Sequence, residues 1–191
     1  SWRSKRANFD YPWRSESDPY RWVVAEILLI RTRRDVVIRV YRELLQRWPT
    51  ACELANANPK EVELVIKPLG LVKRARLLIE AGKALCNGKQ PWEVAGVGEY
   101  SRRLLMLRAE KREAPALDSN AKRIYERITG RRLAERAENS EALLRFFGDC
   151  AHDPLEVSYA VMDFGYAVCK PRNPSCNICP IKSKCKYYRS L

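Results

Sequence analysis

Four cysteines close together near the end of the chain constrain its fold more than any other feature. Cys169, Cys176, Cys179 and Cys185 are separated by six, two and five residues, in a stretch punctuated by prolines that we call the cysteine loop. A compact loop that brings four thiolates together is typical of a cubane iron–sulfur cluster. Structural zinc usually takes two close pairs separated by a longer arm. We therefore expect an iron–sulfur cluster, with zinc as the alternative.

The chain is strongly basic. It has 36 Lys and Arg against 23 Asp and Glu among 191 residues, a net charge of +13. That excess suits a polyanion, and nucleic acid is the first candidate partner. The alternative is the highly charged surface of a thermophile protein, although such surfaces usually mix both signs.

Cysteine usage and hydropathy bear on where the protein works. The seven cysteines are an odd count with four in one loop, which favours a metal site in a reducing compartment over a disulfide framework. The longest apolar run, residues 23–30, is interrupted by Glu26 and is too short to span a membrane, and no secretory signal is visible. We expect an intracellular monomer of the cytoplasm or nucleoid, with no membrane partner.

Helix-start signals followed by apolar residues at helical spacing recur along the chain. Asp18-Pro19, Asn58-Pro59 and Asp153-Pro154 each place a capping side chain before a proline that suits the first turn of a helix. We find no alternating pattern typical of strands, so the sequence predicts an all-α fold.

One predicted helix, from about residue 73 to residue 85, begins with a cluster of positive charge. Lys73, Arg74 and Arg76 lie in its first turn, which is the unfavourable end of the helix dipole for a cation. A nearby phosphate would make them tolerable there, and a solvated face is the alternative.

A glycine turn, a helix and a second helix start follow one another in the middle of the chain. Gly96, Val97 and Gly98 free the backbone to bend and to bring N–H groups close to a ligand. The next helix offers unpaired N–H donors, a site for a phosphate, with Tyr100 at its mouth. Asp118 begins the second helix, where the dipole favours a carboxylate. Without further context the glycines are a plain turn and Asp118 is a plain N-cap.

The cysteine spacing and this glycine-to-aspartate unit together resemble a known family. They are similar to the iron–sulfur DNA glycosylases of the helix-hairpin-helix superfamily, relatives of endonuclease III. Supporting similarities lie in residues 11–14, 18–20, 26–32, 66–71, 117–120 and 162–165. The resemblance implies two helical lobes, namely a barrel of residues 12–112 with the hairpin, and a cluster lobe of residues 1–11 with 113–191. It also implies a [4Fe-4S] cluster on the four cysteines, and double-stranded DNA with a mismatched or damaged base in a cleft between the lobes.

The reaction that the resemblance implies is hydrolysis of the bond between a base and its sugar. The base is first rotated out of the duplex, and the transition state then carries positive charge on the deoxyribose. Asp118 is expected to stabilise that charge or to position a water. Strand-cleaving members of the superfamily have a lysine where this chain has Tyr100. A phenol cannot form their Schiff base, so we expect a monofunctional glycosylase that leaves an abasic site.

Two residues bear on which base is released. Tyr100 and Arg31 resemble the thymine glycosylases that repair G·T and G·U mismatches, whereas the adenine glycosylases that act opposite 8-oxoguanine tend to have a small residue in place of Tyr100. We therefore expect thymine or uracil as the substrate base, with adenine as the alternative. A catalytically silent DNA-binding or damage-sensing protein is the alternative of another class, and the presence of both Asp118 and Glu26 argues against it.

The resemblance assigns three further polar residues. Glu26 corresponds to the pocket glutamate of the adenine enzymes and is expected to hydrogen-bond the base or to orient a water. From its sequence position alone, it lies at the exposed edge of a helix or lines a cavity. Arg31 is expected to fill the gap left by the flipped base, or to contact a phosphate. Asn120, which follows Asp118 in the aspartate motif, is expected to contact DNA.

The glycine turn corresponds to the hairpin of the family. It is expected to bind a backbone phosphate, with a monovalent cation held by its carbonyl groups. Few residues separate Cys86 from Val94, so the first helix of the hairpin must be short, about one turn around residues 90–93. Basic residues in and beside the cysteine loop are expected to contact phosphates. They are Lys170, Arg172, Lys182, Lys184 and Lys186.

Overall fold

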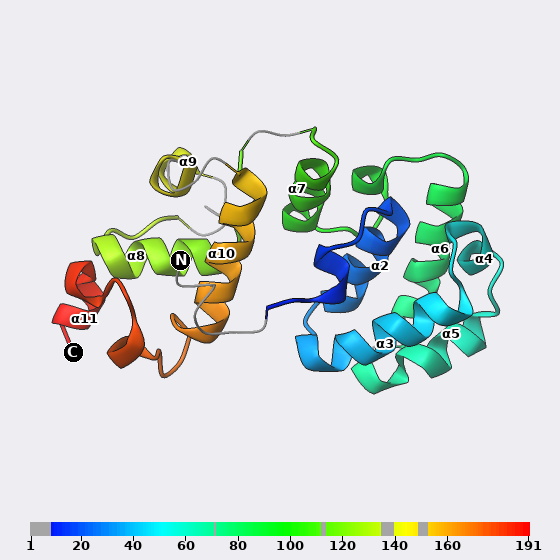
Figure 1. Ribbon diagram of the computed structural model, residues 1–191, viewed down its shortest axis with the longest axis horizontal. Helices are drawn as coiled ribbons and strands as arrows, with labels where there is room; N and C mark the ends of the chain where they lie inside the picture. Colours follow the sequence, from blue (N-terminus) through cyan, green and yellow to red (C-terminus); the bar gives the residue numbers. More distant parts are fainter. Residues whose placement is uncertain (1–8, 71, 112–113, 135–139, 149–152) are drawn as a thin grey trace. The chain divides into compact units, whose positions relative to one another are not determined.

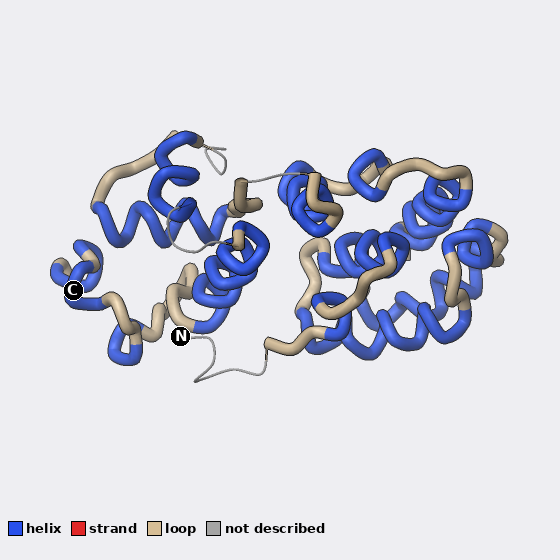
Figure 2. Tube along the Cα trace, turned by 45° about the horizontal axis from the view of Figure 1, so that its top comes forward, coloured by secondary structure: helices blue, strands red, loops and turns tan. Residues whose placement is uncertain are grey.

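The computed structural model describes residues 9–70, 72–111, 114–134, 140–148 and 153–191. All regular structure in these ranges is helical, which confirms the predicted all-α fold (Figure 1, Figure 2). The chain divides into two compact units, Asp10–Met106 and Ser1–Phe9 with Leu107–Leu191. The lobe boundaries expected from the sequence, and the cleft between the lobes, remain predictions.

In the unit Asp10–Met106, α6 packs against α2, α4 and α5, and α2 also packs against α3. Its helices are α2 (Pro19–Leu29), α3 (Arg34–Arg47), α4 (Ala51–Ala55), α5 (Pro59–Ile66), α6 (Arg74–Cys86) and α7 (Glu99–Arg108), the last of which runs on into the second unit. Short 3-10 helices are η1 (Pro12–Arg14), η2 (Lys67–Leu69) and η3 (Pro91–Glu93). Fully buried side chains on α2, α3 and α6 include Val23, Ile27, Leu28, Tyr41, Leu44 and Leu78.

Helices α4 and α6 pack closely in this unit, as Figure 1 shows. A Cβ atom added to Gly82 on α6 would lie 2.9 Å from the carbonyl oxygen of Ala51 on α4. Cys52 and Cys86 form a disulfide between the two helices, with their Cα atoms 5.0 Å apart. The cysteine count had favoured a metal site over disulfides and did not predict this bond. Cys150 lies outside the described residues.

The predicted helix starts are confirmed by their capping hydrogen bonds. The carboxylates of Asp18 and Asp153 and the amide oxygen of Asn58 each accept from the backbone N–H two residues further on, at 2.9, 2.8 and 3.0 Å. Each cap satisfies one of the N–H groups that a helix leaves unpaired at its start.

The second unit has a smaller core and a long segment outside it. Its helices are α8 (Ser119–Thr129), α9 (Glu141–Gly148), α10 (Pro154–Ala167) and α11 (Lys186–Arg189), with 3-10 helices η4 (Cys176–Ile178) and η5 (Lys182–Lys184). Apolar side chains of α8, α9 and α10 pack together: Leu117, Ala121, Ile124, Tyr125, Leu143, Phe147, Val157 and Val161. No side chain of η4, η5 or α11 is buried. The 3-10 helices of the cysteine loop therefore lie outside the apolar core, although Cys169 at the start of the loop packs against it.

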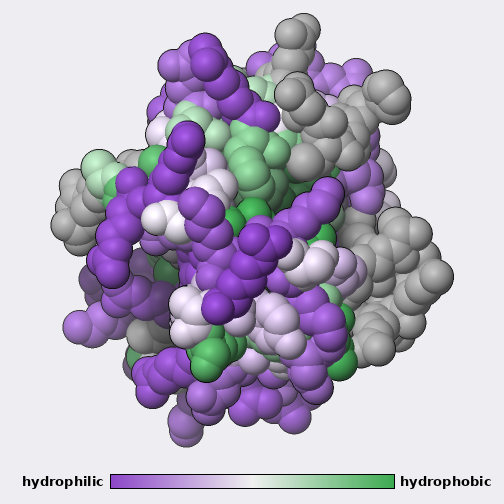
Figure 3. Space-filling model, turned by 90° about the vertical axis from the view of Figure 1, so that its left-hand side faces the viewer, coloured by the Kyte–Doolittle hydropathy of each residue, from purple (hydrophilic) through white to green (hydrophobic). Residues whose placement is uncertain are grey.

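Hydrophilic side chains dominate the face of the molecule seen from the side of α8 and α11, with smaller apolar areas between them (Figure 3). Exposed basic residues after α10 are Arg172, Lys182, Lys184, Lys186 and Arg189. Across the described ranges, no helix has both the length and the apolar character that a membrane span requires.

Candidate active site and cysteine cavity

Asp118 lies at the start of α8 with its carboxylate hydrogen-bonded by several N–H groups. One carboxylate oxygen accepts from the backbone N–H groups of Asn120, at 2.9 Å, and Ala121, at 3.2 Å. The other accepts from the side-chain amide of Asn120. The residue is half-buried. Charge-assisted bonds and the positive end of α8 both stabilise the carboxylate anion.

A chain of hydrogen bonds runs from Asp118 to the start of the cysteine loop. The amide oxygen of Asn120 accepts from Arg123 Nη2 at 2.6 Å. The same guanidinium donates to the carbonyl oxygens of Cys169, at 2.9 Å, and Gly165, at 3.0 Å. Burial lowers the pKa of Arg123 from its ordinary value, partly offset by the Cys169 sulfur. Helix α8 therefore connects Asp118 to the first cysteine of the loop through polar contacts alone.

Gly165 on α10 makes room for this chain. A Cβ atom added to Gly165 would lie 2.6 Å from the Cβ atom of Asn120, closer than carbon atoms can approach. Any side chain at position 165 would therefore displace Asn120 from its contacts with Asp118 and Arg123.

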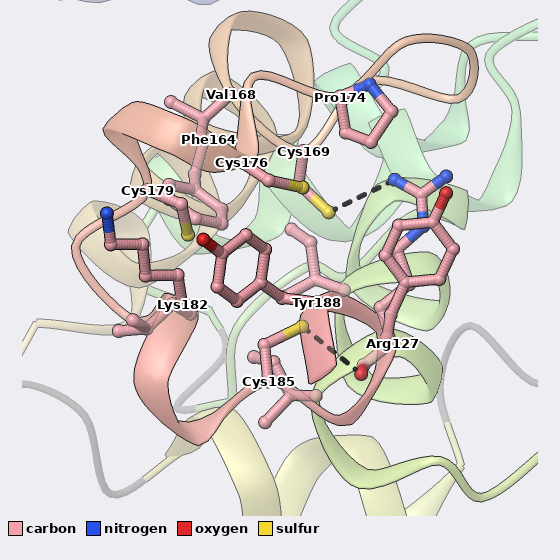
Figure 4. A pocket seen from close by; sticks show the side chains of 14 residues that line it. Arg127, Phe164, Val168, Cys169, Pro174, Cys176, Cys179, Lys182, Cys185 and Tyr188 are labelled. Atoms are coloured by element: carbon pink, nitrogen blue, oxygen red, sulfur yellow. Dashed lines mark hydrogen bonds between the residues drawn. The ribbon is translucent and has the colours of Figure 1, made fainter. Parts of the chain in front are cut away.

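The four loop cysteines are free thiols that line one cavity (Figure 4). The cavity is partly open to solvent. Its remaining wall is largely apolar and includes Ile124, Phe164 and Val168. Burial is the main cause that raises the pKa of the Cys176 and Cys179 thiols above its ordinary value.

Arg127 of α8 ties the loop to the helix. Its guanidinium donates to Cys169 Sγ at 3.4 Å and to the carbonyl oxygens of Lys170 and Pro171 at 2.7 and 2.9 Å. The backbone carbonyl of Arg127 accepts from the Cys185 thiol at 3.3 Å, and its guanidinium lies over the Tyr187 ring. These bonds reach both ends of the loop and hold its first and last cysteines against α8.

The four sulfurs are not arranged for a single metal ion. Among the described residues, which include all four loop cysteines, no three Cys, His, Asp or Glu side chains converge on one ion position. Tetrahedral zinc would hold its sulfurs roughly 4 Å apart, since each Zn–S bond is about 2.3 Å. Four thiol side chains around one cavity are the kind of donor set that holds an iron–sulfur cluster.

In the other unit, Glu26 of α2 contacts α7. One oxygen of the half-buried Glu26 carboxylate accepts from the Ser101 hydroxyl at 2.5 Å. Of the two positions that the sequence left open, the structure thus places Glu26 against a neighbouring helix and not at an exposed edge. Tyr100, the residue before Ser101, is also half-buried.

The hairpin has the abbreviated first helix expected from its sequence. It is the 3-10 helix η3, closed by a capping box in which Glu93 accepts from the Gln90 N–H at 3.0 Å. Gly96 has φ +82°, and a Cβ atom there would collide with Leu77 of α6, so glycine is required on two counts. Open space adjoins Gly98, whose carbonyl accepts from the Arg102 N–H at 2.8 Å.

Residues 24–148 match the family described as HhH-GPD superfamily base excision DNA repair protein, where HhH denotes the helix-hairpin-helix motif. The chain belongs to this superfamily. The matched range contains Glu26, the hairpin, Asp118 and Asn120, and it ends before the cysteine loop.

Within the superfamily, the chain is similar over almost its whole length to two archaeal proteins. It is 32% identical to a thymine/uracil-DNA glycosylase of Pyrobaculum aerophilum, covering 98% of this chain and 89% of the relative. It is also 32% identical to a thymine-DNA glycosylase of Aeropyrum pernix, covering 99% and 92%. The solved structure of a thermostable thymine-DNA glycosylase covers 100% of this chain and 92% of its own, with a TM-score of 0.78 and 26% identity. An adenine DNA glycosylase of Mycobacterium tuberculosis is more distant, at 27% identity over 62% of its length.

The site residues predicted for this helix-hairpin-helix protein fall into two groups. Asp118 and Asn120 lie in the unit that carries the four cysteines, whereas Glu26, Arg31, Tyr100 and residues 96–98 belong to the unit Asp10–Met106. Asn120 was expected to contact DNA, but in the structure its side-chain amide donates to Asp118 and accepts from Arg123. Its contact with DNA remains a prediction, as do the catalytic and DNA-binding roles of the others.

Sequence reasoning missed three residues that position these groups. Arg123 and Ser101 carry no sequence signal of their own, because arginine and serine on a helix are usually solvated. Gly165 does carry one, since a glycine inside a helix costs about 1 kcal/mol and so indicates a close approach by another group.

Proposed function

We propose that this protein is a monofunctional DNA glycosylase that releases thymine or uracil mispaired with guanine and leaves an abasic site in double-stranded DNA. The observation that carries the proposal is the half-buried Asp118 carboxylate, hydrogen-bonded at the start of α8 in a member of a base excision repair superfamily. The choice of base is supported by the two archaeal thymine glycosylases, which match over nearly the whole chain.

Asp118 acts on the sugar in this proposal. As the bond between the base and C1′ breaks, positive charge develops on the deoxyribose, and a fixed carboxylate lowers the energy of that state. Water adds to C1′, its proton is lost to solvent or to Asp118, and the departing base takes up a proton. Because the carboxylate is already oriented by N–H donors, little reorganisation is needed when the charge appears.

Tyr100 and Glu26 act on the extruded base. A phenol has no amine with which to attack the sugar, so Tyr100 limits the reaction to base release. Its half-buried ring suits stacking on a pyrimidine. Glu26, held by Ser101, is oriented to accept a hydrogen bond from the N3–H of thymine or uracil, or from a water.

The cysteine loop is proposed to hold a [4Fe-4S] cluster. Four free thiols around one cavity, a largely apolar wall and a loop without buried side chains support this assignment over zinc. The bound cluster supplies a structural cross-link, since every iron is occupied by a cysteine. The exposed lysines and arginines of the loop then contact DNA phosphates.

The remaining DNA contacts lie in the unit Asp10–Met106. Backbone groups of residues 96–98 are proposed to bind a phosphate, together with a monovalent cation, and Arg31 to fill the space of the extruded nucleotide. We propose that the enzyme acts as a monomer in the cytoplasm or nucleoid.

The test is incubation with G·T, G·U and A·8-oxoguanine duplexes, followed by alkali, which cleaves DNA at abasic sites. We expect alkali-dependent cleavage at the T or U strand. Cleavage at the adenine strand alone would establish the adenine alternative, and cleavage without alkali would contradict the monofunctional assignment. No abasic site in any duplex would overturn the glycosylase function and favour the silent DNA-binding protein.

Asp118→Asn is the matched variant for this assay. The asparagine side chain has the same size and keeps one oxygen to accept the capping N–H bonds, but it has no charge. Turnover should therefore fall by roughly a thousandfold or more, while mismatch binding persists. The control is Ser119→Ala, because Ser119 is the next residue of the chain and is exposed. Its turnover should be normal.

A further inference from the structure

Arg74 is a buried cation with an unusual set of partners. Only 8% of the residue is exposed, and none of the described carboxylates is its partner. Its guanidinium instead reaches from the first turn of α6 to the end of α2. It donates to the carbonyl oxygens of Leu28, at 3.0 Å, and Ile30, and to the Thr32 hydroxyl at 2.9 Å.

These bonds close the C-terminal end of α2. The last carbonyl groups of a helix lack intrahelical partners, and they carry partial negative charge. Arg74 is also 3.4 Å from the carbonyl oxygen of Ile27, so it covers three of these carbonyls. The Thr32 hydroxyl adds a bond to the Ile30 carbonyl at 3.0 Å. The charge that is unfavourable at the start of α6 is thus placed well for α2, so Arg74 corresponds neither to the solvated face nor to the phosphate contact that the sequence left open for it.

The segment held in this way contains Arg31. Its backbone has φ +51°, a left-handed conformation that costs a non-glycine residue about 1 kcal/mol or more and persists only when its surroundings fix it. The Arg31 side chain is exposed and has no hydrogen-bond or ion-pair partner among the described residues. Bonds to residues on both sides of Arg31 therefore hold its backbone while leaving its side chain free.

We infer that Arg74 is a positioning residue for base extrusion: it fixes the α2–α3 turn so that the Arg31 side chain is presented to the DNA before the base leaves the stack. This inference rests on the proposed function. If the turn that carries Arg31 is already rigid, no free energy is spent on ordering it during the reaction. More of the contact energy between Arg31 and DNA is then available for base extrusion. A lysine cannot replace Arg74, since one ammonium group cannot reach acceptors spread along the turn as a planar guanidinium does.

The first test needs neither DNA nor activity. Amide hydrogen exchange is measured over residues 27–33 in the wild type, Arg74→Lys, Arg74→Met and the control Arg76→Met. Arg76 is two residues away on the same helix, exposed and without a partner among the described residues. Exchange should accelerate about tenfold or more in both Arg74 variants and stay unchanged in the control. Unchanged exchange in the Arg74 variants would show that Arg74 does not hold the turn.

The second test is a double-mutant cycle on single-turnover release of uracil from a G·U duplex. Arg74→Lys and Arg31→Ala should each slow release by about tenfold to a hundredfold, and the double variant should be no slower than the slower single variant. Additive slowing would mean that Arg74 acts on the stability of the unit and not through Arg31. If the wild type released no base at all, the proposed function would fail, whereas the exchange measurement would still decide whether Arg74 fixes the turn.

Arg74→Met leaves several carbonyls unpaired in the interior and is therefore the harsher variant. If it fails to fold, Arg74→Lys carries both tests, because it retains the charge at the end of α2. Extrusion is then measured separately from release by the fluorescence of 2-aminopurine placed at the target position. A smaller signal for Arg74→Lys, with the signal for Arg76→Met unchanged, is the expected result. Equal signals for these two variants would overturn the inference.

Discussion

In the unit Asp10–Met106, Cys52 and Cys86 are bonded to each other and join α4 to α6, whereas in the second unit the four loop cysteines are free thiols around a shared cavity. The disulfide lies beside helices whose apolar side chains are already fully buried. The cysteine loop has no buried side chains in η4, η5 or α11. The same residue type thus cross-links two packed helices in one unit and lines a cavity as free thiols in the other, so loss of cysteines should have very different effects in the two units.

The largest effect is expected from Cys179→Ser. Removing one of four ligands should prevent the proposed cluster from assembling, and the loop would then be held mainly by its polar bonds to Arg123 and Arg127. We expect loss of bound iron and of absorption near about 400 nm, and at least a hundredfold fall in base release. Cys52→Ser, which removes a cysteine of the other unit, is the control and should retain its iron. Full iron content in Cys179→Ser would remove that residue from the ligand set.

Cys52→Ser should lower the stability of its own unit. The disulfide closes a loop with a sequence separation of 34, for which chain entropy gives up to roughly 4 kcal/mol. The melting temperature should therefore fall in the absence of reductant, while base release at moderate temperature is kept. Treating the wild type with a reductant should lower its melting temperature by the same amount and leave the variant unchanged. A variant that melts with the wild type in oxidising buffer would contradict a stabilising role.

Gly165→Ala should have an intermediate effect, because it disturbs the polar chain that links Asp118 to the cysteine loop. The added methyl group would overlap Asn120 and cost about 1–3 kcal/mol in stability or in displacement of that side chain. We expect kcat to fall about tenfold while KM changes little. The matched control is Gly148→Ala in α9, where no atom of the described residues outside the helix's own backbone and the adjacent residues lies within 4 Å of the added carbon. Equal kcat values for the two variants would show that the position of Asn120 does not matter for turnover.

The smallest effect is a pH dependence confined to the unit Asp10–Met106. The Tyr20 hydroxyl donates to the Trp48 carbonyl at 2.7 Å, and burial, aided by Asp18 and Glu53, raises the pKa of Tyr20 well above its ordinary value. The folded state therefore retains the phenol proton at a pH where the unfolded chain loses it. The stabilisation of the folded state by protonated Tyr20 is fully present below pH ~10. It is lost as pH rises towards the folded pKa, by up to about 1.4 kcal/mol per pH unit. The free energy of unfolding of Tyr20→Phe, measured with urea, should therefore decline less steeply above pH ~10 than that of the wild type.

Much of the fold could be predicted from the sequence because its signals are local. Capping residues such as Asp18 and Asn58, and the short span before Val94, determine where helices begin, whatever packs against them. The disulfide could not be predicted, because it depends on α4 and α6 lying side by side, and a cysteine count does not report which elements are neighbours.

The sequence offered the candidate site residues, whose roles remain predictions, but not the residues that hold them. Asp118 and the four cysteines were recognisable from spacing and resemblance. Arg74 and Ser101 were not, because their partners lie far away in the chain. Arg74 even gave a misleading signal, since its charge is unfavourable for its own helix and favourable for α2.

Helix α8 holds Asp118 at its first turn and, through Arg127, both ends of the cysteine loop near its last. It has 11 residues and is therefore about 16 Å long. Each residue added to a helix turns everything beyond it by about 100°. An insertion or deletion within α8 would thus rotate the carboxylate away from its orientation relative to the loop, even if every named side chain were kept. The number of residues between these two points therefore matters as much for the orientation of Asp118 relative to the loop as their identity does.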